Sequence, residues 1–194
     1  QTDDAQEASF SENPLQHVRE LYTRFLQGVF SARPVGNYQW RPDDKHTEVC
    51  IVNENPLNPL VYGQRPIMTL TRSEVQFQSL GLDDMIYTDV RTGMKRKSVL
   101  IPGAMTISVC SRVDQESENL AMIVADSLWS LRDVLQRMGF FHVGQNIRVG
   151  APGPPGSIMA NDAGKEWYCT RVLSPFQFVR TNQITPLNQD VFQH

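Results

Sequence analysis

Residues 104–138 of this chain of 194 residues read AMTISVCSRVDQESENLAMIVADSLWSLRDVLQRM, and this stretch decides the fold. Its first part alternates, because Met105, Ile107 and Val109 are apolar whereas Thr106 and Ser108 between them are polar. Successive side chains of a β-strand point to opposite faces of the sheet. The pattern therefore predicts a strand over 104–111 that buries one face only.

A helix is expected directly after this strand. Asp114 is of a type that caps helix N-termini with a side-chain oxygen, and Glu116 and Glu118 place negative charge in the first turn, where the helix dipole favours it. We expect the helix to begin at about Gln115 and to stop at Gly139, which tolerates the left-handed conformation. A continuous apolar stripe predicts one buried face: Leu120, Val124, Leu128, Leu131, Leu135 and Met138.

The same helix carries a second, weaker apolar row, formed by Met122, Ile123, Trp129 and Val134. Burial against a single sheet does not require apolar residues over so much of the circumference. We therefore expect a second contact surface here, such as one for another subunit, with Met122 and Trp129 as interface candidates.

Length and composition favour one domain. A chain of this size buries roughly 70% of its unfolded surface and needs no disulfide bonds or structural metal to do so. Its contents of 40% hydrophobic and 20% charged residues are ordinary for a globular protein. We expect a flexible N-terminal arm over 1–12, one domain over 13–181 and a polar tail over 182–194. The formal net charge of −3 argues against a nucleic-acid binder that relies on bulk charge.

The chain shows neither a membrane span nor a signal peptide. No apolar run approaches the roughly 18 residues that cross a bilayer, and the first thirty residues lack the basic start and apolar middle of a signal peptide. We therefore expect a soluble protein made in a reducing compartment. Cys50, Cys110 and Cys169 fall singly in apolar stretches, which indicates small buried hydrophobic residues and no disulfide framework.

The first part of the domain should combine a helix with an irregular excursion. Asn13-Pro14 favours a helix start, and a stripe from Leu15 to Val29 predicts a helix ending near Phe30. Residues 31–44 hold prolines and a glycine around Tyr38 and Trp40, which we expect to be exposed aromatic anchors and interface candidates. A short strand over 48–52 should follow.

Further strands are expected on either side of the central one. Residues 66–71 and 75–77 alternate around a polar turn, which predicts a hairpin. Residues 81–97 are polar and turn at Gly93, so we expect a hairpin arm that projects from the body. Pro102-Gly103 suggests a bulge, and 166–173 should begin a long bent strand.

The arm carries the main charge concentration of the chain: Arg91, Lys95, Arg96 and Lys97. Such a cluster can face the phosphates of a nucleic acid or an acidic partner. An ordinary solvated hairpin tip is the alternative, and for a single copy both readings stay open. A ring of copies would repeat the cluster around a common axis.

No catalytic or cofactor motif stands out. Asp83, Asp84 and Asp89 lack the spacing of a calcium loop, and the four histidines are too dispersed to form a ligand pair on a helix. The glycines of 150–156 lack the Gly-Lys-Ser/Thr ending of a phosphate-binding loop. We therefore expect no enzyme activity, no cofactor and no metal site.

The expected order of elements is helix, excursion, strands, projecting hairpin, strand, long helix and closing strand. It predicts an α+β fold: a single mixed or antiparallel sheet, with the long helix and the N-terminal helix packed on one face and a β-hairpin arm that projects. The chain resembles the tail-terminator family of tailed bacteriophages over roughly 65–181. The similarity lies in the strand at 65–69, the arm, the strand at 105–109 that leads into the acidic helix start at 114–118, and the strand at 167–169.

The resemblance implies a structural protein of the virion neck that assembles in the host cytoplasm. Six copies would form a ring that caps the tail tube, binds the tube protein and a head-side connector, and lets double-stranded DNA pass through its bore without sequence readout. No membrane is involved. One alternative is another neck ring, a stopper or adaptor, or a subunit like that of the tail tube; a second is a small metal-dependent phosphoesterase that uses Asp83, Asp84 and Asp89.

Overall fold

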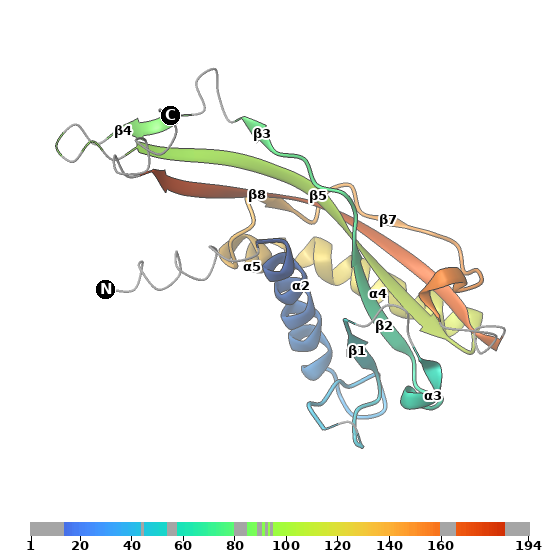
Figure 1. Ribbon diagram of the computed structural model, residues 1–194. Helices are drawn as coiled ribbons and strands as arrows, with labels where there is room; N and C mark the ends of the chain where they lie inside the picture. The colour runs from blue at the N-terminus through green and yellow to red at the C-terminus, as the bar shows by residue number, and fades with distance from the viewer. Residues whose placement is uncertain are drawn as a thin grey trace.

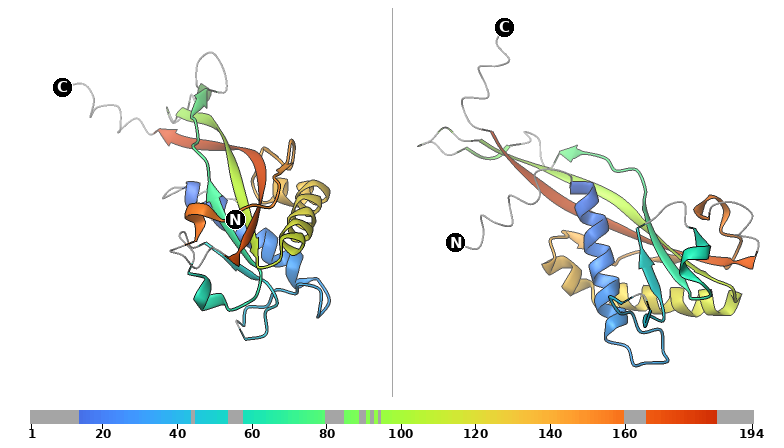
Figure 2. Two further views of the ribbon diagram at one scale, coloured as in Figure 1. Left: turned by 90° about the vertical axis from the view of Figure 1, so that its right-hand side faces the viewer. Right: turned by 60° about the horizontal axis from the view of Figure 1, so that its bottom comes forward.

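The computed structural model describes residues 14–43, 45–53, 58–79, 85–88, 91, 93, 95–159 and 166–184. These residues form one mixed sheet with two longer helices on one of its faces, and the sheet extends past the helices at one end (Figures 1 and 2). The predicted α+β class, with one sheet and helices on one face, is confirmed. Among the described residues, every helix is too short or too polar to cross a bilayer.

The helical segments are α2 (Pro14–Ser31), α3 (Pro59–Tyr62), α4 (Asp114–Ser130), α5 (Arg132–Arg137) and the 3₁₀ turn η1 (Gly156–Ile158). The strands are β1 (Cys50–Val52), β2 (Ile67–Arg72), β3 (Gln78–Ser79), β4 (Met85–Thr88), β5 (Lys95–Ser111), β6 (His142–Val143), β7 (Arg148–Val149) and β8 (Tyr168–Ile184). The predicted first helix and first strand are both present.

Two long antiparallel strands, β5 and β8, form the backbone of the sheet. They pair without a register shift from Lys95 opposite Ile184 to Ser111 opposite Tyr168. At about 3.4 Å per residue, a strand of 17 residues is about 58 Å long. β2 pairs with the other side of β5, β1 lies parallel to β2, and β6 and β7 line the outer edge of β8.

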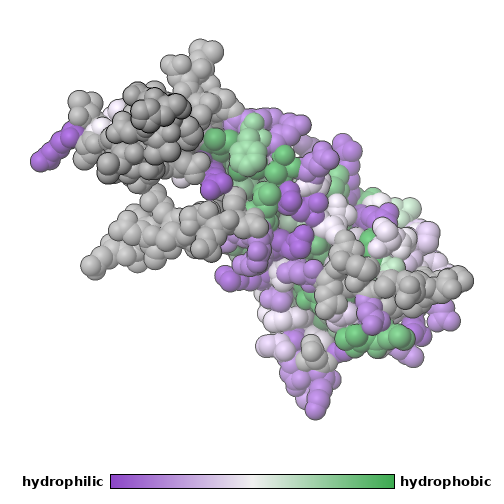
Figure 3. All heavy atoms as spheres, in the orientation of Figure 1, coloured by the Kyte–Doolittle hydropathy of each residue, from purple (hydrophilic) through white to green (hydrophobic). Residues whose placement is uncertain are grey.

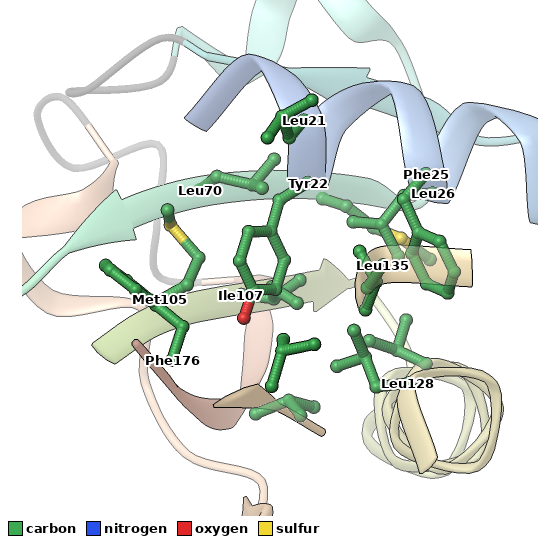
Figure 4. Packing of buried hydrophobic residues seen from close by; sticks show 14 of the residues in the cluster. Leu21, Tyr22, Phe25, Leu26, Leu70, Met105, Ile107, Leu128, Leu135 and Phe176 are labelled. Atoms are coloured by element: carbon green, nitrogen blue, oxygen red, sulfur yellow. The ribbon is translucent and has the colours of Figure 1, made fainter. Parts of the chain in front are cut away.

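The main core lies between the helices and one face of the sheet. Met105, Ile107 and Val109 of β5 are fully buried there, as the alternation predicted. The prediction that the strand buries one face only is wrong, because Ser108 and Cys110 on the opposite face are also fully buried, Cys110 in a second, smaller apolar cluster. Side chains from α2, α4 and α5 meet the sheet in one cluster, in which Tyr22 of α2 lies beside Met105, Ile107 and Phe176 (Figure 4). Tyr22, Phe140 and Phe176 contact one another edge-on or tilted, with ring centroids 5.4–6.3 Å apart.

Two buried hydroxyl pairs tie the helices to β8. Tyr22 of α2 and Ser174 share a hydrogen bond of 2.9 Å, and so do Ser117 of α4 and Thr170. Burial raises the pKa of Tyr22 well above its ordinary value, and the bond to Ser174 offsets this only in part. Because each hydroxyl has a partner, these polar groups are accommodated in the core.

The central strand is longer than the sequence predicted, because Pro102-Gly103 does not interrupt it. Pro102 pairs with Gln177 and Gly103 with Phe176 in an unbroken register. A Cβ on Gly103 would lie 2.8 Å from Cζ of Phe176 and 2.9 Å from Cγ1 of Val75. Glycine is therefore required by the close approach of the Phe176 ring. The closing strand is likewise continuous and reaches Ile184, three residues past the predicted end of the domain.

The predicted hairpin between 66–71 and 75–77 is wrong. β2 and β3 do not pair with each other; both run along β5, with Arg72 opposite Met105 and Gln78 opposite Leu100. The chain between them stays attached to β5, since Ser73 N donates to the Ala104 carbonyl and Gln76 N to that of Pro102. The polar residues between β2 and β3 thus depart from regular pairing along the edge of β5, and the chain continues in the same direction.

The helical stretch runs from Asp114 to Arg137 and stops before Gly139, whose φ is 114°, so its predicted bounds hold, but it differs from its prediction at the N-cap and in the middle. It begins at Asp114, so Val113 is the N-cap and provides no side-chain bond. Asp114 Oδ1 still accepts from Gln115 N at 2.7 Å. The helix then breaks at Leu131 into α4 and α5. At this break the backbone of Gly144 (φ +72°) packs so close that an added Cβ would lie 2.6 Å from the Leu128 carbonyl oxygen.

The projecting arm is formed at the far end of β5. β4 pairs there with the first residues of β5, and the last residues of β8 pair with the opposite side. This end of the sheet lies beyond both long helices (Figure 1). The predicted flexible arm over 1–12 and the residues of the tail after 184 lie outside the described residues.

Candidate interaction surfaces

The helical layer exposes four large apolar side chains, which we call the α4–α5 outer face: Met122, Trp129, Leu131 and Val134. Their exposed fractions are 46%, 57%, 41% and 43%. The prediction that Leu131 belongs to the buried stripe is wrong, because this residue lies at the break between the two helices. Met122 and Trp129 are seven residues apart, two helical turns, so they lie on one side of α4, about 10 Å apart along its axis. Both interface candidates from the sequence are thus exposed on a side of the helix that does not serve the core.

Polar groups border this face. The guanidinium carbon of Arg132 lies 5.8 Å from the Trp129 ring centroid, within the range of a cation–π contact. Asp126 is exposed one turn before Trp129. Ile123, assigned to the same apolar row from sequence, instead lies partly buried against the core. The outer face is therefore an apolar strip with a charged rim, which is the usual composition of a protein interface.

Tyr38 and Trp40 are less exposed than predicted, because both pack partly buried against the main core. Tyr38 adopts a left-handed backbone conformation (φ 60°). Desolvation, followed by the nearby Glu116 carboxylate, raises the pKa of its hydroxyl. The excursion is therefore anchored to the body near the start of α4, and these two rings are core-rim residues in the monomer.

Glu48 holds the excursion in shape. Its two carboxylate oxygens accept from the backbone N–H groups of Gly36, at 2.6 Å, and Gln39, at 2.8 Å. These bonds favour the charged form and hold the pKa of Glu48 below its ordinary value. The segment is thus an ordered loop with defined ends, although few of its residues belong to a helix or strand.

The basic cluster lies at the tip of the arm. Arg91 is exposed, and the backbone of Lys95, Arg96 and Lys97 is paired on both sides, with β4 and with the end of β8. The side chains of these three residues lie outside the described part of the structure. The sheet therefore fixes the position of the cluster along the chain, and its charge comes from the sequence alone.

Two exposed apolar sites were not singled out from the sequence. Leu60 and Val61 on α3 are 83% and 66% exposed, and Phe77 just before β3 is 63% exposed. Apolar side chains gather over α3 and beside β3 on the face seen in Figure 3. The exposure of Leu60 and Val61 could have been predicted from the sequence Pro59-Leu60-Val61, because these two adjacent apolar residues lie in a segment too short to bury one face.

An unpaired strand edge is a further possible contact. Beyond Phe178, no strand among the described residues pairs with the outer edge of β8. The pairing of β6 ends opposite Gln177 of β8, and that of β7 ends opposite Leu173. The free N–H and C=O groups of this edge include those of Val179 and Thr181. Such an edge is a template for a strand of another chain.

Pockets and possible metal ligands bear on the phosphoesterase alternative. One open pocket of about 340 Å³ lies between α2 and β2, lined by Leu15, Gln16, Arg19, Glu20, Asn53 and Arg72. Within the described ranges no three His, Cys, Asp or Glu side chains gather as metal ligands. Asp83, Asp84 and Asp89, the residues of the phosphoesterase alternative, lie outside those ranges.

Comparison with models of known protein families and with curated proteins finds no match for this chain.

Proposed function

We propose that this protein is a structural subunit of a tailed-phage virion, a tail terminator whose ring caps the tail tube and joins it to the head connector. The observation that carries the proposal is the α4–α5 outer face. Four large exposed apolar side chains with charged neighbours, on α4, on α5 and at the break between them, suit a permanent contact with another subunit.

The arm supports the same proposal. Strands β5 and β8 continue past Ile101 and Phe178, the last of their residues in the main core, by six residues each. Among the apolar side chains that the structure describes in this extension, only Val99 packs against the main core, so contacts outside the monomer would explain its length. In a ring it would reach a neighbour, the tube or the lumen.

The mechanism would be one of assembly. The α4–α5 outer face of one copy and a different surface of the next form a heterologous contact, which closes into a ring when the rotation between copies divides a full turn. Six copies would then occupy the growing end of the tube and stop its polymerisation. The arm would place its basic cluster where DNA passes, and contacts to phosphates require no sequence readout.

The test compares Trp129→Lys with Leu60→Lys, two variants that each replace an exposed apolar residue by a charge. Trp129 lies on the proposed contact and Leu60 on α3, away from it. Light scattering and negative-stain imaging, with and without tail tubes, should show six-fold rings for wild type and for Leu60→Lys. Trp129→Lys should remain monomeric with an unchanged circular dichroism spectrum, because it charges the contact without touching the core.

Three outcomes would contradict the proposal. One is a wild-type protein that stays monomeric and leaves tube length unaffected. Another is a ring that forms equally well in both variants, which would remove the α4–α5 outer face from the contact. Rings that bind the portal side and ignore tubes would favour a stopper or adaptor over a terminator.

A further inference from the structure

Two of the three cysteines are partners across the central strand pair. Cys110 of β5 lies opposite Cys169 of β8, and their sulfur atoms are 2.9 Å apart. All three cysteines are buried, as the sequence predicted, and Cys110 and Cys169 are close in space although neither has a close partner in the sequence. They are 59 residues apart in the sequence, so only the pairing of β5 with β8 reveals the contact.

The backbone geometry of this pair suits a covalent bond. Cys169 exchanges both of its backbone hydrogen bonds with Gly153, at 2.7 and 3.1 Å, so its N–H and C=O point away from β5. Cys110 and Cys169 are therefore a non-hydrogen-bonded pair, in which Cα atoms lie about 4.5 Å apart. That separation falls at the short end of the range of about 4.4–6.8 Å found for disulfides.

We propose that Cys110 and Cys169 form a redox couple, a dithiol that a small peroxide converts to a cross-strand disulfide, which clamps β5 to β8 at the end of the sheet opposite the arm. Cys50 provides a built-in comparison. It lies in the same transverse row, opposite Ile67, which is in turn opposite Cys110. Two strand spacings separate Cys50 from Cys110 by about 9–10 Å, beyond the reach of a disulfide.

The chemistry balances with hydrogen peroxide as the oxidant. The sulfur of Cys169 attacks one peroxide oxygen, the O–O bond breaks, and a sulfenic acid and water result. The sulfur of Cys110 then attacks that of Cys169, the S–O bond breaks, and the departing oxygen leaves as water with the Cys110 proton. Cys169 is suited to the first attack, because the Cys110 thiol donates to its sulfur and, with Arg171 nearby, lowers its pKa.

The experiment treats the native protein with dilute hydrogen peroxide, denatures it and alkylates free thiols with N-ethylmaleimide. We expect the number of alkylated cysteines to fall from the three of the chain to one, and the intact mass measured before alkylation to fall by two hydrogens. Trypsin should release peptides 98–112 and 166–171 joined by a bond that dithiothreitol cleaves. Peptide 46–72, which holds Cys50, should stay alkylated. The thermal midpoint should rise by roughly 5–15 °C, because the bond closes a long loop.

The variants give matched controls. Cys50→Ala should keep both the mass change and the rise in midpoint, whereas Cys110→Ala and Cys169→Ala should each lose both. Because burial can keep peroxide out of the native state, the reduced chain is also refolded in a glutathione redox buffer. Three alkylated thiols under both conditions, a bond that involves Cys50, or oxidation to sulfinic acid without a link would each overturn the proposal.

Discussion

At the scale of single residues, Tyr22 shows how a polar group is accommodated in the core. Its ring contacts Phe140 and Phe176, and its hydroxyl reaches Ser174 at 2.9 Å. We expect Tyr22→Phe to lower the free energy of unfolding by about 1–2 kcal/mol, because the Ser174 hydroxyl is left buried without this partner. Urea unfolding measures this. Tyr22→Phe combined with Ser174→Ala should recover part of the loss, and a purely additive double variant would contradict the hydrogen-bond explanation.

Tyr22 also predicts a pH dependence. Burial raises its pKa in the folded state above its ordinary value of 10, so above pH 10 the unfolded chain releases a proton that the folded chain keeps. Stability contributed by this group is then complete below pH 10 and is lost as the pH rises further, by about 1.4 kcal/mol per pH unit. The difference in unfolding free energy between wild type and Tyr22→Phe, measured from pH 8 to 11, should shrink accordingly.

Gly103 is the second residue whose identity the packing dictates. We expect Gly103→Ala to cost about 1–3 kcal/mol, because its Cβ would overlap the Phe176 ring inside the core. Gly28→Ala is the matched control: nothing lies within 4 Å of its added Cβ, and it sits in α2. That change should stabilise by about 0.5–1 kcal/mol, since alanine favours a helix. Equal effects of the two changes would argue against the close approach.

At the scale of elements, Gly144 packs against the end of α4, next to the break between α4 and α5. Its backbone packs against the Leu128 carbonyl, in the last turn before the break. We expect Gly144→Ala to destabilise by more than 2 kcal/mol, because a left-handed conformation and a contact with rigid backbone add up. Gly36→Ala has a similar φ, +81°, but open space around it, and should cost only about 1–2 kcal/mol. Thermal unfolding of both variants decides whether the contact matters.

At the scale of the whole molecule, the sheet separates two tasks. Its helix-covered half holds the core, and the far ends of β5 and β8 carry the basic cluster out to the arm. This arrangement lets surface changes on the arm leave the fold intact.

The arm prediction follows from the charge of that cluster. We expect Lys95→Glu combined with Lys97→Glu to reduce the number of joined heads and tails, because two attractive charges become repulsive to phosphates. The monomer should keep its thermal midpoint, and electron microscopy of assembly reactions counts the joined particles. Normal joining by the double variant would show that the cluster is an ordinary solvated tip.

Patterns that a segment carries within itself could be predicted from the sequence. The alternation of 104–111, the stripe of α4 and the stripe of α2 each indicated the correct element, because an apolar face must be buried whatever it meets. The exposure of Met122 and Trp129 followed in the same way, since the helix has more apolar residues than one sheet face can cover.

The tertiary structure alone decided which strands pair with each other and in which register. The sequence of 73–77 is compatible with a hairpin turn between β2 and β3 and also with an irregular segment that joins two strands along β5. The structure has the second arrangement, because both β2 and β3 pair with β5. The close approach of Gly144 to Leu128 and the Cys110–Cys169 pair both arise between segments that are separated in the sequence. Local periodicity fixes which face of a segment is buried, whereas partners and register arise from contacts between segments that no local pattern contains.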